Sequence, residues 1–282
     1  MERITDTRSK GINRNALRTW ALLLAIGGLV GRGLIQNQML GVATATGAEL
    51  LAMMDSNMTL VTVSLFLQLT ETMAVPLFAL LLAEGVSHTA DLKAYALRVT
   101  ATAVLAEIPY DLLMHSRAFD MTSQNPMGGL VLGLLVVHFF RMYEEKGAKN
   151  FMVKLLVVVM GILWARMLRI DMGEAVVLLV WPMYTLRNKE TVRNVVAAIM
   201  AMVCSFFSVF FVTAPFGCLF LHFYNGEKGE EEPPKALTYA AYPAAMVLLA
   251  LAGMFLIKKR TPLEISSGVF LCCYPIFSHR LL

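Results

Sequence analysis

The chain has 282 residues, of which 57% are hydrophobic and only 16% are charged, and its formal net charge is +4. This composition is too apolar for a soluble domain of such length, so it excludes a soluble enzyme and predicts an all-α, polytopic membrane protein. The positive charge is spread unevenly along the chain and therefore indicates membrane orientation, not a nucleic-acid-binding surface.

Apolar runs of about 20 residues predict about eight membrane-spanning helices. The first run follows a basic stretch and is expected to be retained as an anchor, because no small-residue cleavage site follows it. The fourth and sixth runs are short, so they are either tilted crossings or incomplete ones. In chain order the predicted spans are 17–35, 58–84, 92–113, 127–142, 151–168, 173–186, 192–213 and 237–257.

Lysine and arginine residues gather in alternate connections between these spans. One set of connections holds Lys93, the basic residues of 141–154 and 187–193, and Lys258 to Arg260, whereas the other set is poor in cations. Cytoplasmic loops are enriched in cations, so the pattern predicts eight spans with both termini in the cytoplasm. The layout is then a cytoplasmic tail (1–16), a transmembrane domain (17–257) and a basic and apolar tail (258–282).

Three segments of this scheme lie outside the predicted spans. Residues 41–49 are a loop or a shallow helix. Residues 214–235 form an outer segment whose apolar middle, PFGCLFLHFYN, is too short to cross the membrane but is expected to dip back into the protein. Residues 263–282 are also too short to cross and are expected at the membrane interface.

Ionisable residues inside the second and third spans are candidates for a functional site. A charge placed in hydrocarbon costs on the order of 3 kcal/mol, so such residues usually face a polar cavity or a partner. Glu71 lies midway along the second span, and Glu107 lies in the third span, two residues before Pro109. We expect both carboxylates to line a cavity, with Arg166 or Arg169 of another span as the partner of Glu107.

For the residues near the cytoplasmic end of these spans, there is a simpler explanation than a functional site. Glu84 and His88 are four residues apart and share a helix face if the helix continues that far. Solvation at the membrane interface explains both of them, and Lys93, equally well. Arg98 is close enough to the same end for its side chain to extend to the cytoplasmic face.

The cysteine residues give no sign of a disulfide framework or a metal site. They form no CxxC pair, and no histidine lies at a metal-ligand spacing from them. We therefore expect no metal. The four residues are Cys204, Cys218, Cys272 and Cys273.

Several motifs occur in a specific order between residues 73 and 251. They are PLFALLLAEGVSHTADLKAYALRV, LAEIPYDL, QNPMGGLVLGLL, IDMGEAVVLL, HFYNGEKG and AAYP. In this order they resemble the TraX family of pilin-acetylase-like integral membrane proteins. The resemblance implies an acyltransferase of a bacterial plasma membrane, which transfers an acetyl group from acetyl-CoA to a protein N-terminus or to another amine or hydroxyl acceptor.

The resemblance also suggests roles for individual residues, because acyl transfer needs a base, oxyanion donors and cations for the CoA phosphates. His88 is the implied base, since imidazole exchanges protons near neutral pH. The implied catalytic group is His88, Glu84, Glu107 and Asp111. The implied phosphate contacts are Lys93, Arg98 and Arg141, and the implied acceptor-binding residues are Glu71, Gln124, Asn125, Asn225 and Gly226.

The chain departs from the typical family member at three places. The typical member has an Asp-His pair in its first span, an arginine shortly before the Ala-x-Pro motif and a histidine two residues after the last Tyr-Pro. Gly27 and Gly28, Thr72 and Ala245 stand at these places here. The alternative function is therefore that of an inactive relative, acting as a transporter, a channel-like protein or an accessory protein.

Overall fold

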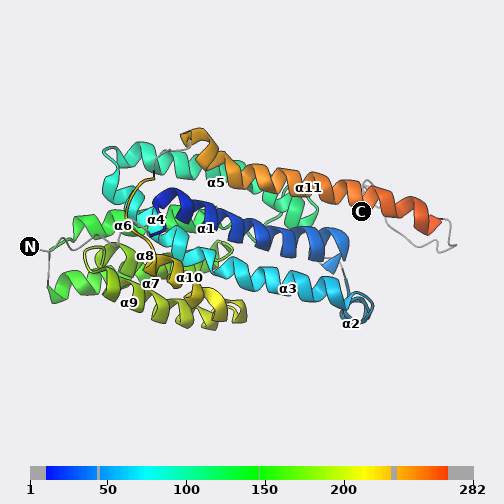
Figure 1. Cartoon of the computed structure of the whole chain (residues 1–282), viewed down its shortest axis with the longest axis horizontal. Helices are drawn as coiled ribbons and strands as arrows, with labels where there is room; N and C mark the ends of the chain where they lie inside the picture. Colours follow the sequence, from blue (N-terminus) through cyan, green and yellow to red (C-terminus); the bar gives the residue numbers. More distant parts are fainter. Residues whose placement is uncertain (1–10, 43–44, 146, 230–233, 266–282) are drawn as a thin grey trace, which may run out of the picture.

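A computed structural model describes residues 11–42, 45–145, 147–229 and 234–265. These residues fold as an all-helical bundle without a named strand, which confirms the fold class predicted from composition. Most of the two predicted tails, residues 1–10 and 266–282, lies outside the described residues. The bundle is elongated, with the start of α1 (Arg14–Gly28) at one end and the end of α11 (Lys235–Ile265) at the other (Figure 1). We call these the N-terminal end and the far end.

Long helices form one half of the bundle. The helix that starts at Arg14 continues as the π-helix η2, and α3 continues as α4 after a break at Met73. The break arises because Pro76 has no N–H and its ring crowds the carbonyl of Thr72. Besides α1 and α11, the long elements are η2 (Leu29–Met39), α3 (Met58–Thr72), α4 (Ala74–His88) and α5 (Leu92–His115).

Four described helices are long and apolar enough to cross a membrane, namely Arg14–Met39, Met58–His88, Ala148–Met167 and Leu237–Leu256. They indicate a membrane protein, while the number of crossings stays a prediction. The stretch before α3 that was left open as loop or helix contains the start of α2 (Gly47–Ser56), which has a capping box between Thr46 and Glu49.

Shorter helices form the other half. Their central element is α8 (Gly173–Thr185), which is mostly buried and packs against α4, α6 (Met127–Met142) and α7 (Ala148–Met167). The loop 116–126 folds back along α5, so that α6 begins beside the middle of that helix. The side-chain amide of Asn125 donates to the carbonyl of Ala103 at 2.9 Å, which holds the loop at this depth.

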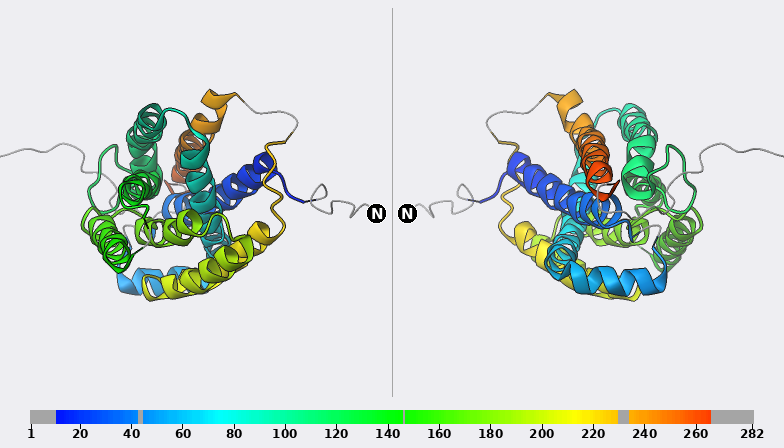
Figure 2. Two further views of the ribbon diagram at one scale, coloured as in Figure 1. Left: turned by 90° about the vertical axis from the view of Figure 1, so that its left-hand side faces the viewer. Right: turned by 90° about the vertical axis from the view of Figure 1, so that its right-hand side faces the viewer.

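The structure corrects the prediction of one continuous span over residues 192–213, because the chain turns back inside the protein at the end of this segment. Its residues form α9 (Glu190–Val203) and the 3₁₀ turns η4 (Cys204–Phe206) and η5 (Val209–Thr213), and the chain then returns as α10 (Ala214–His222). At the apex, the hydroxyl of Thr72 donates to the carbonyl of Phe210 at 3.1 Å. The end views in Figure 2 show the α9–α10 hairpin along one edge of the bundle, and α11 beside α5.

Residues 223–227, predicted on the outer side, lie instead at the N-terminal end. The N–H of Ile12 donates to the carbonyl of Phe223 at 2.8 Å, and the N–H of Asn225 donates to the carbonyl of Ile12 at 3.0 Å. From there α11 runs to the far end. The described start of α1 and end of α11 therefore lie at opposite ends of the bundle, whereas the cytoplasmic location of both termini stays a prediction. An apolar run of spanning length turns back here where the protein itself binds the polar groups of its turn.

A reporter-fusion experiment tests this arrangement. A reporter inserted at Gly229, whose neighbours are Asn13 and Asn15, is expected on the same side of the membrane as a reporter at the N-terminus. A reporter fused after Arg260 is expected on the opposite side. The charge-based scheme gives the reverse for both positions, so side-specific activity of the two fusions distinguishes the arrangements.

Candidate functional site

A polar cavity of about 480 Å³ lies between the two halves of the bundle. It is bordered by η2, α3, the loop 116–126, the turn between α7 and α8, and the apex of the α9–α10 hairpin. The cavity therefore lies where the short helices end beside the long ones. Its polar lining residues are Arg32, Gln68, Glu71, Thr72, Ser123, Arg166, Arg169, Asp171, Glu174 and Ser208.

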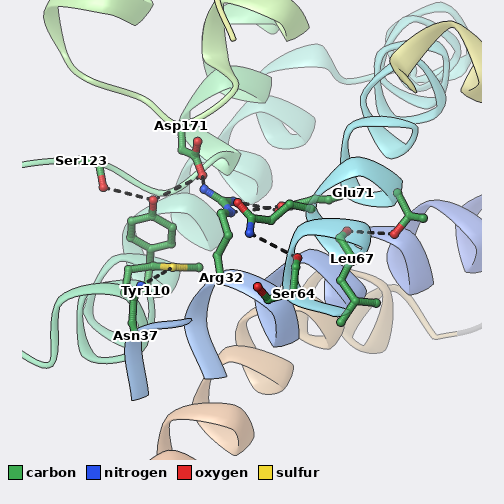
Figure 3. A network of polar contacts seen from close by, with 11 residues as sticks. Arg32, Asn37, Ser64, Leu67, Glu71, Tyr110, Ser123 and Asp171 are labelled. Carbon is green, nitrogen blue, oxygen red and sulfur yellow. Dashed lines mark hydrogen bonds and ion pairs between the residues drawn. The ribbon is translucent and has the colours of Figure 1, made fainter. Parts of the chain in front are cut away.

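Arg32 lies between two carboxylates in this cavity (Figure 3). Its Nη2 and Nε donate to the two carboxylate oxygens of Glu71, at 2.9 and 3.1 Å, and its Nη1 lies 2.6 Å from Oδ2 of Asp171. The side chain of Glu71 is only 3% exposed. A two-pronged contact of this kind is the strongest that arginine makes with a carboxylate, so the three side chains form one charged cluster.

The helix that carries Arg32 is shaped to allow this contact. Arg32 belongs to the π-helical segment η2, a rare conformation that is frequent at functional sites. One turn earlier, an added Cβ at Gly28 would lie 2.0 Å from the carboxyl carbon of Glu71. Gly28 therefore leaves the space that Glu71 occupies.

Asp171 is held by an unusual turn between α7 and α8. Arg169 and Met172 on either side of it have left-handed backbone conformations, with φ values of 54° and 57°. The turn is paired with the loop 116–126, because Gln124 donates its N–H to the carbonyl of Arg169 at 2.9 Å and accepts the N–H of Asp171 at 3.0 Å. Strained residues that persist in this way are often part of a functional site.

Polar contacts of Tyr110 and Ser123 connect the charged cluster with His115. The hydroxyl of Tyr110 donates to Oδ2 of Asp171 at 3.4 Å and lies 3.2 Å from the hydroxyl of Ser123. Nε2 of His115 lies 2.9 Å from the same serine oxygen. Ser123 lines the cavity and therefore joins His115 to the space where a substrate would bind.

Next to these contacts, the loop 116–126 carries the carboxylate of Asp120, which stays ionised. Thr122 donates its hydroxyl and its N–H to Asp120, and these hydrogen bonds lower the pKa of Asp120 below its ordinary value. The N–H of Asp120 in turn donates to Asp111 of α5 at 2.9 Å. The contacts fix the loop that positions Ser123.

Of the residues predicted from the sequence, Glu71 lines the cavity, and Gln124 supports it through its backbone. Glu107 is bound by the side chain and the N–H of Asn125, and Asp111 is bound as described, so these carboxylates attach the loop to α5. The expected arginine partner of Glu107 is not observed, since Arg166 contacts Glu174 at 3.5 Å. Asn125, which lies 18 positions further along the chain, contacts Glu107 instead.

The remaining predicted residues lie at the N-terminal end, apart from the cavity. Glu84 accepts hydrogen bonds from Arg14 at 3.1 Å and from Tyr224 at 2.7 Å. His88 is exposed, with its Nδ1 2.9 Å from the carbonyl of Glu84. The other predicted residues at this end are Lys93 and Arg141 at helix ends, Arg98 about two turns into α5, and Asn225 and Gly226 in the segment beside Ile12.

Five residues of the site were not predicted from the sequence. Arg32 is the one with a clear signal, because a lone arginine between apolar residues carries the same cost in hydrocarbon as Glu71. Within the described residues, no group of three His, Cys, Asp or Glu side chains could hold a metal ion. The five residues are Arg32, Tyr110, His115, Ser123 and Asp171.

Comparison with known proteins identifies the family of the chain. The family described as TraX protein matches residues 13–253, which include every residue of the polar cavity. Searches of curated proteins and of solved structures found no match. The match confirms the resemblance that the ordered motifs indicate. The chain therefore belongs to the TraX family.

Proposed function

We propose that the protein is a membrane-embedded acyltransferase whose reaction centre is the polar cavity. The observation that carries this proposal is the hydrogen bond between His115 and Ser123, of which Ser123 lines the cavity. A histidine that contacts a hydroxyl at hydrogen-bond distance is the arrangement by which many enzymes remove a proton from an acceptor.

In the proposed reaction the acceptor amine or hydroxyl donates its proton to the hydroxyl of Ser123. The serine passes its own proton to Nε2 of His115. The acceptor then forms a C–N or C–O bond to the acyl carbon while the C–S bond of the thioester breaks. The leaving thiolate takes a proton from the hydroxyl of Ser123, which is reprotonated by His115. No other reactant is needed.

The charged cluster has a separate role in this proposal. Asp171 accepts the hydrogen bond of Tyr110 and so fixes Tyr110 beside Ser123, whose own proton is directed to Nε2 of His115. Arg32 holds Asp171 and Glu71 in place and compensates their charges. The amide of Gln68 and the guanidinium of Arg169 also line the cavity and are candidate donors to the oxyanion that develops on the acyl carbonyl.

Family membership supports acetyl-CoA as the donor, a protein N-terminus or a small amine or hydroxyl compound as the acceptor, and a bacterial plasma membrane as the location. The non-catalytic alternative, a transporter or accessory protein, differs in one measurable property. It would fold and occupy the membrane without cleaving the thioester.

An acetyl-CoA assay tests the proposal. The purified protein in lipid nanodiscs is expected to release CoA thiol from acetyl-CoA when peptides with free N-termini and small amines or alcohols are supplied as acceptors. Ser123→Ala is expected to lower the rate by about 100-fold or more, because the proton path is broken. Ser87→Ala is the matched control, since its hydroxyl bonds a carbonyl of its own helix at the N-terminal end. Folded wild-type protein that is no faster than Ser123→Ala would favour the non-catalytic alternative.

A further inference from the structure

Two smaller cavities lie one after the other between the polar cavity and the N-terminal end of the bundle, and we call them together the passage. One has a volume of about 180 Å³ and is edged by Arg14 and Arg18, and the other has a volume of about 100 Å³ and reaches Glu71. They share lining residues from α1, α4, α6 and α11. The inner one also shares Glu71 and Met172 with the polar cavity. The shared residues of the two smaller cavities are Leu22, Phe78, Met127, Leu130, Thr238 and Tyr239.

Two arginines at the outer cavity, which is the mouth of this passage, are free to bind an anion. Arg18 lines this cavity, and Arg98 lies beside Tyr239, which lines it as well. Arg18 contacts the hydroxyl of Thr238 at 3.5 Å, and the guanidinium of Arg98 lies 6.0 Å from the ring centre of Tyr239. Among the described residues, no carboxylate lies within ion-pair distance of either arginine. Arg14 differs, because it is already bound to Glu84.

The inner part of the passage is narrow and mostly apolar. Most of its wall consists of apolar side chains such as Ala25, Val75 and Phe78. Its polar lining residues are Glu71, Thr238, Tyr239 and Tyr242. On α1 the lining of the two cavities runs from Arg14 to Ala25, so the passage is about 16 Å long from the helical rise. A ligand that fills it must therefore be slender and extended, with its anionic part at the mouth.

We propose that this passage binds the extended arm of the CoA thioester, with the nucleotide phosphates at Arg18 and Arg98 and the thioester next to Glu71. The proposal rests on the function proposed above and adds the route of the donor. The donor then approaches from the N-terminal end, while the acceptor enters the polar cavity, which opens among the ends of the short helices. Donor and acceptor meet at the wall formed by Glu71 and Met172, which both spaces share.

The charge distribution assigns the donor to the cytoplasmic side. The N-terminal end carries most of the cations, and cation-rich ends of membrane proteins face the cytoplasm. CoA and its thioesters are charged and do not cross a bilayer unaided. The cations at the described helix ends here include Arg14, Arg18, Lys93, Arg141, Lys149, Arg187 and Lys189.

Binding of CoA to blocked variants tests the passage without requiring turnover. Leu22→Trp places a large ring where the two cavities meet, whereas Leu23→Trp places the same ring on the exposed face of the same helix, where Leu23 is 55% exposed. In calorimetry with purified protein, Leu22→Trp is expected to weaken CoA binding by about 10-fold or more, and Leu23→Trp is expected to bind like the wild type. Thr238→Trp blocks the passage from another helix and replaces Leu22→Trp if that variant does not fold.

A shorter probe separates the mouth from the passage. Adenosine 3′,5′-bisphosphate carries phosphates of CoA without the arm, so its binding should be weakened in Arg18→Ala and Arg98→Ala but unchanged in Leu22→Trp. Wild-type protein that does not bind CoA, or blocked variants that bind it normally, would overturn the proposal. Protein that binds CoA as expected but releases no thiol from acetyl-CoA would instead contradict the proposed function and leave the passage intact.

Discussion

Arg32→Leu is expected to remove most of the folded protein from the membrane. The substitution leaves Glu71, with a side chain that is 3% exposed, and Asp171 without the cation that both contact. Breaking a buried ion pair by removing one partner costs about 3–5 kcal/mol, which is a large part of the free energy of unfolding of a typical domain. Membrane abundance and the melting temperature of the purified remainder measure the effect.

Further variants separate this cause from general damage. Arg117→Leu also removes an arginine from an ion pair, but that side chain is 75% exposed and its contact with Asp120 is 3.4 Å, so the expected cost is at most about 1 kcal/mol. Arg32→Lys keeps the charge but cannot make the two-pronged contact with Glu71, so an intermediate loss is expected. Glu71→Gln added to Arg32→Leu should recover part of the stability, since one stranded charge is removed. Equal melting temperatures for Arg32→Leu and Arg117→Leu would contradict the cluster as described.

His115→Ala is expected to lower the rate of acyl transfer by about 100-fold or more without lowering the melting temperature by more than a few degrees. The histidine is only partly buried, and its ring contacts the hydroxyl of Ser123 at 2.9 Å, so its removal breaks the proton path and little packing. The thiol-release assay on variants of matched purity gives the rate. His115→Gln is expected to be equally slow, because an amide keeps a hydrogen bond but does not accept the proton.

Other histidines provide the controls for this experiment. His138→Ala changes a residue of α6 outside the lining of the polar cavity and is expected to keep the wild-type rate. His88→Ala decides between the two proposed bases, since the family motif points to His88 and the geometry points to His115. A 100-fold loss in His88→Ala with normal turnover in His115→Ala would place the base at the N-terminal end and refute the proton path through Ser123.

Much of the fold could be predicted from the sequence, because the length of an apolar run is a local property. The predicted span 127–142 coincides with α6, and the span predicted from residue 173 begins where α8 begins. The all-helical membrane bundle and the family follow from such runs and from the ordered motifs. Glu71 was also found this way, since a carboxylate in the middle of an apolar run stands out without any knowledge of its partner.

The topology and the partners of the charges were decided only by the tertiary structure. Residues 192–213 read as a span and 214–235 as an outer segment that dips back. In the structure α9 and α10 are instead the two arms of one hairpin, whose apex contacts Thr72, and α11 then runs from the N-terminal end to the far end. Likewise, Glu71 pairs with Arg32, which lies 39 positions away in the sequence. Burial cost shows that a charge in an apolar helix needs a partner, but the partner is whichever side chain the packing of distant helices brings within about 3 Å, and no local pattern in the sequence records that.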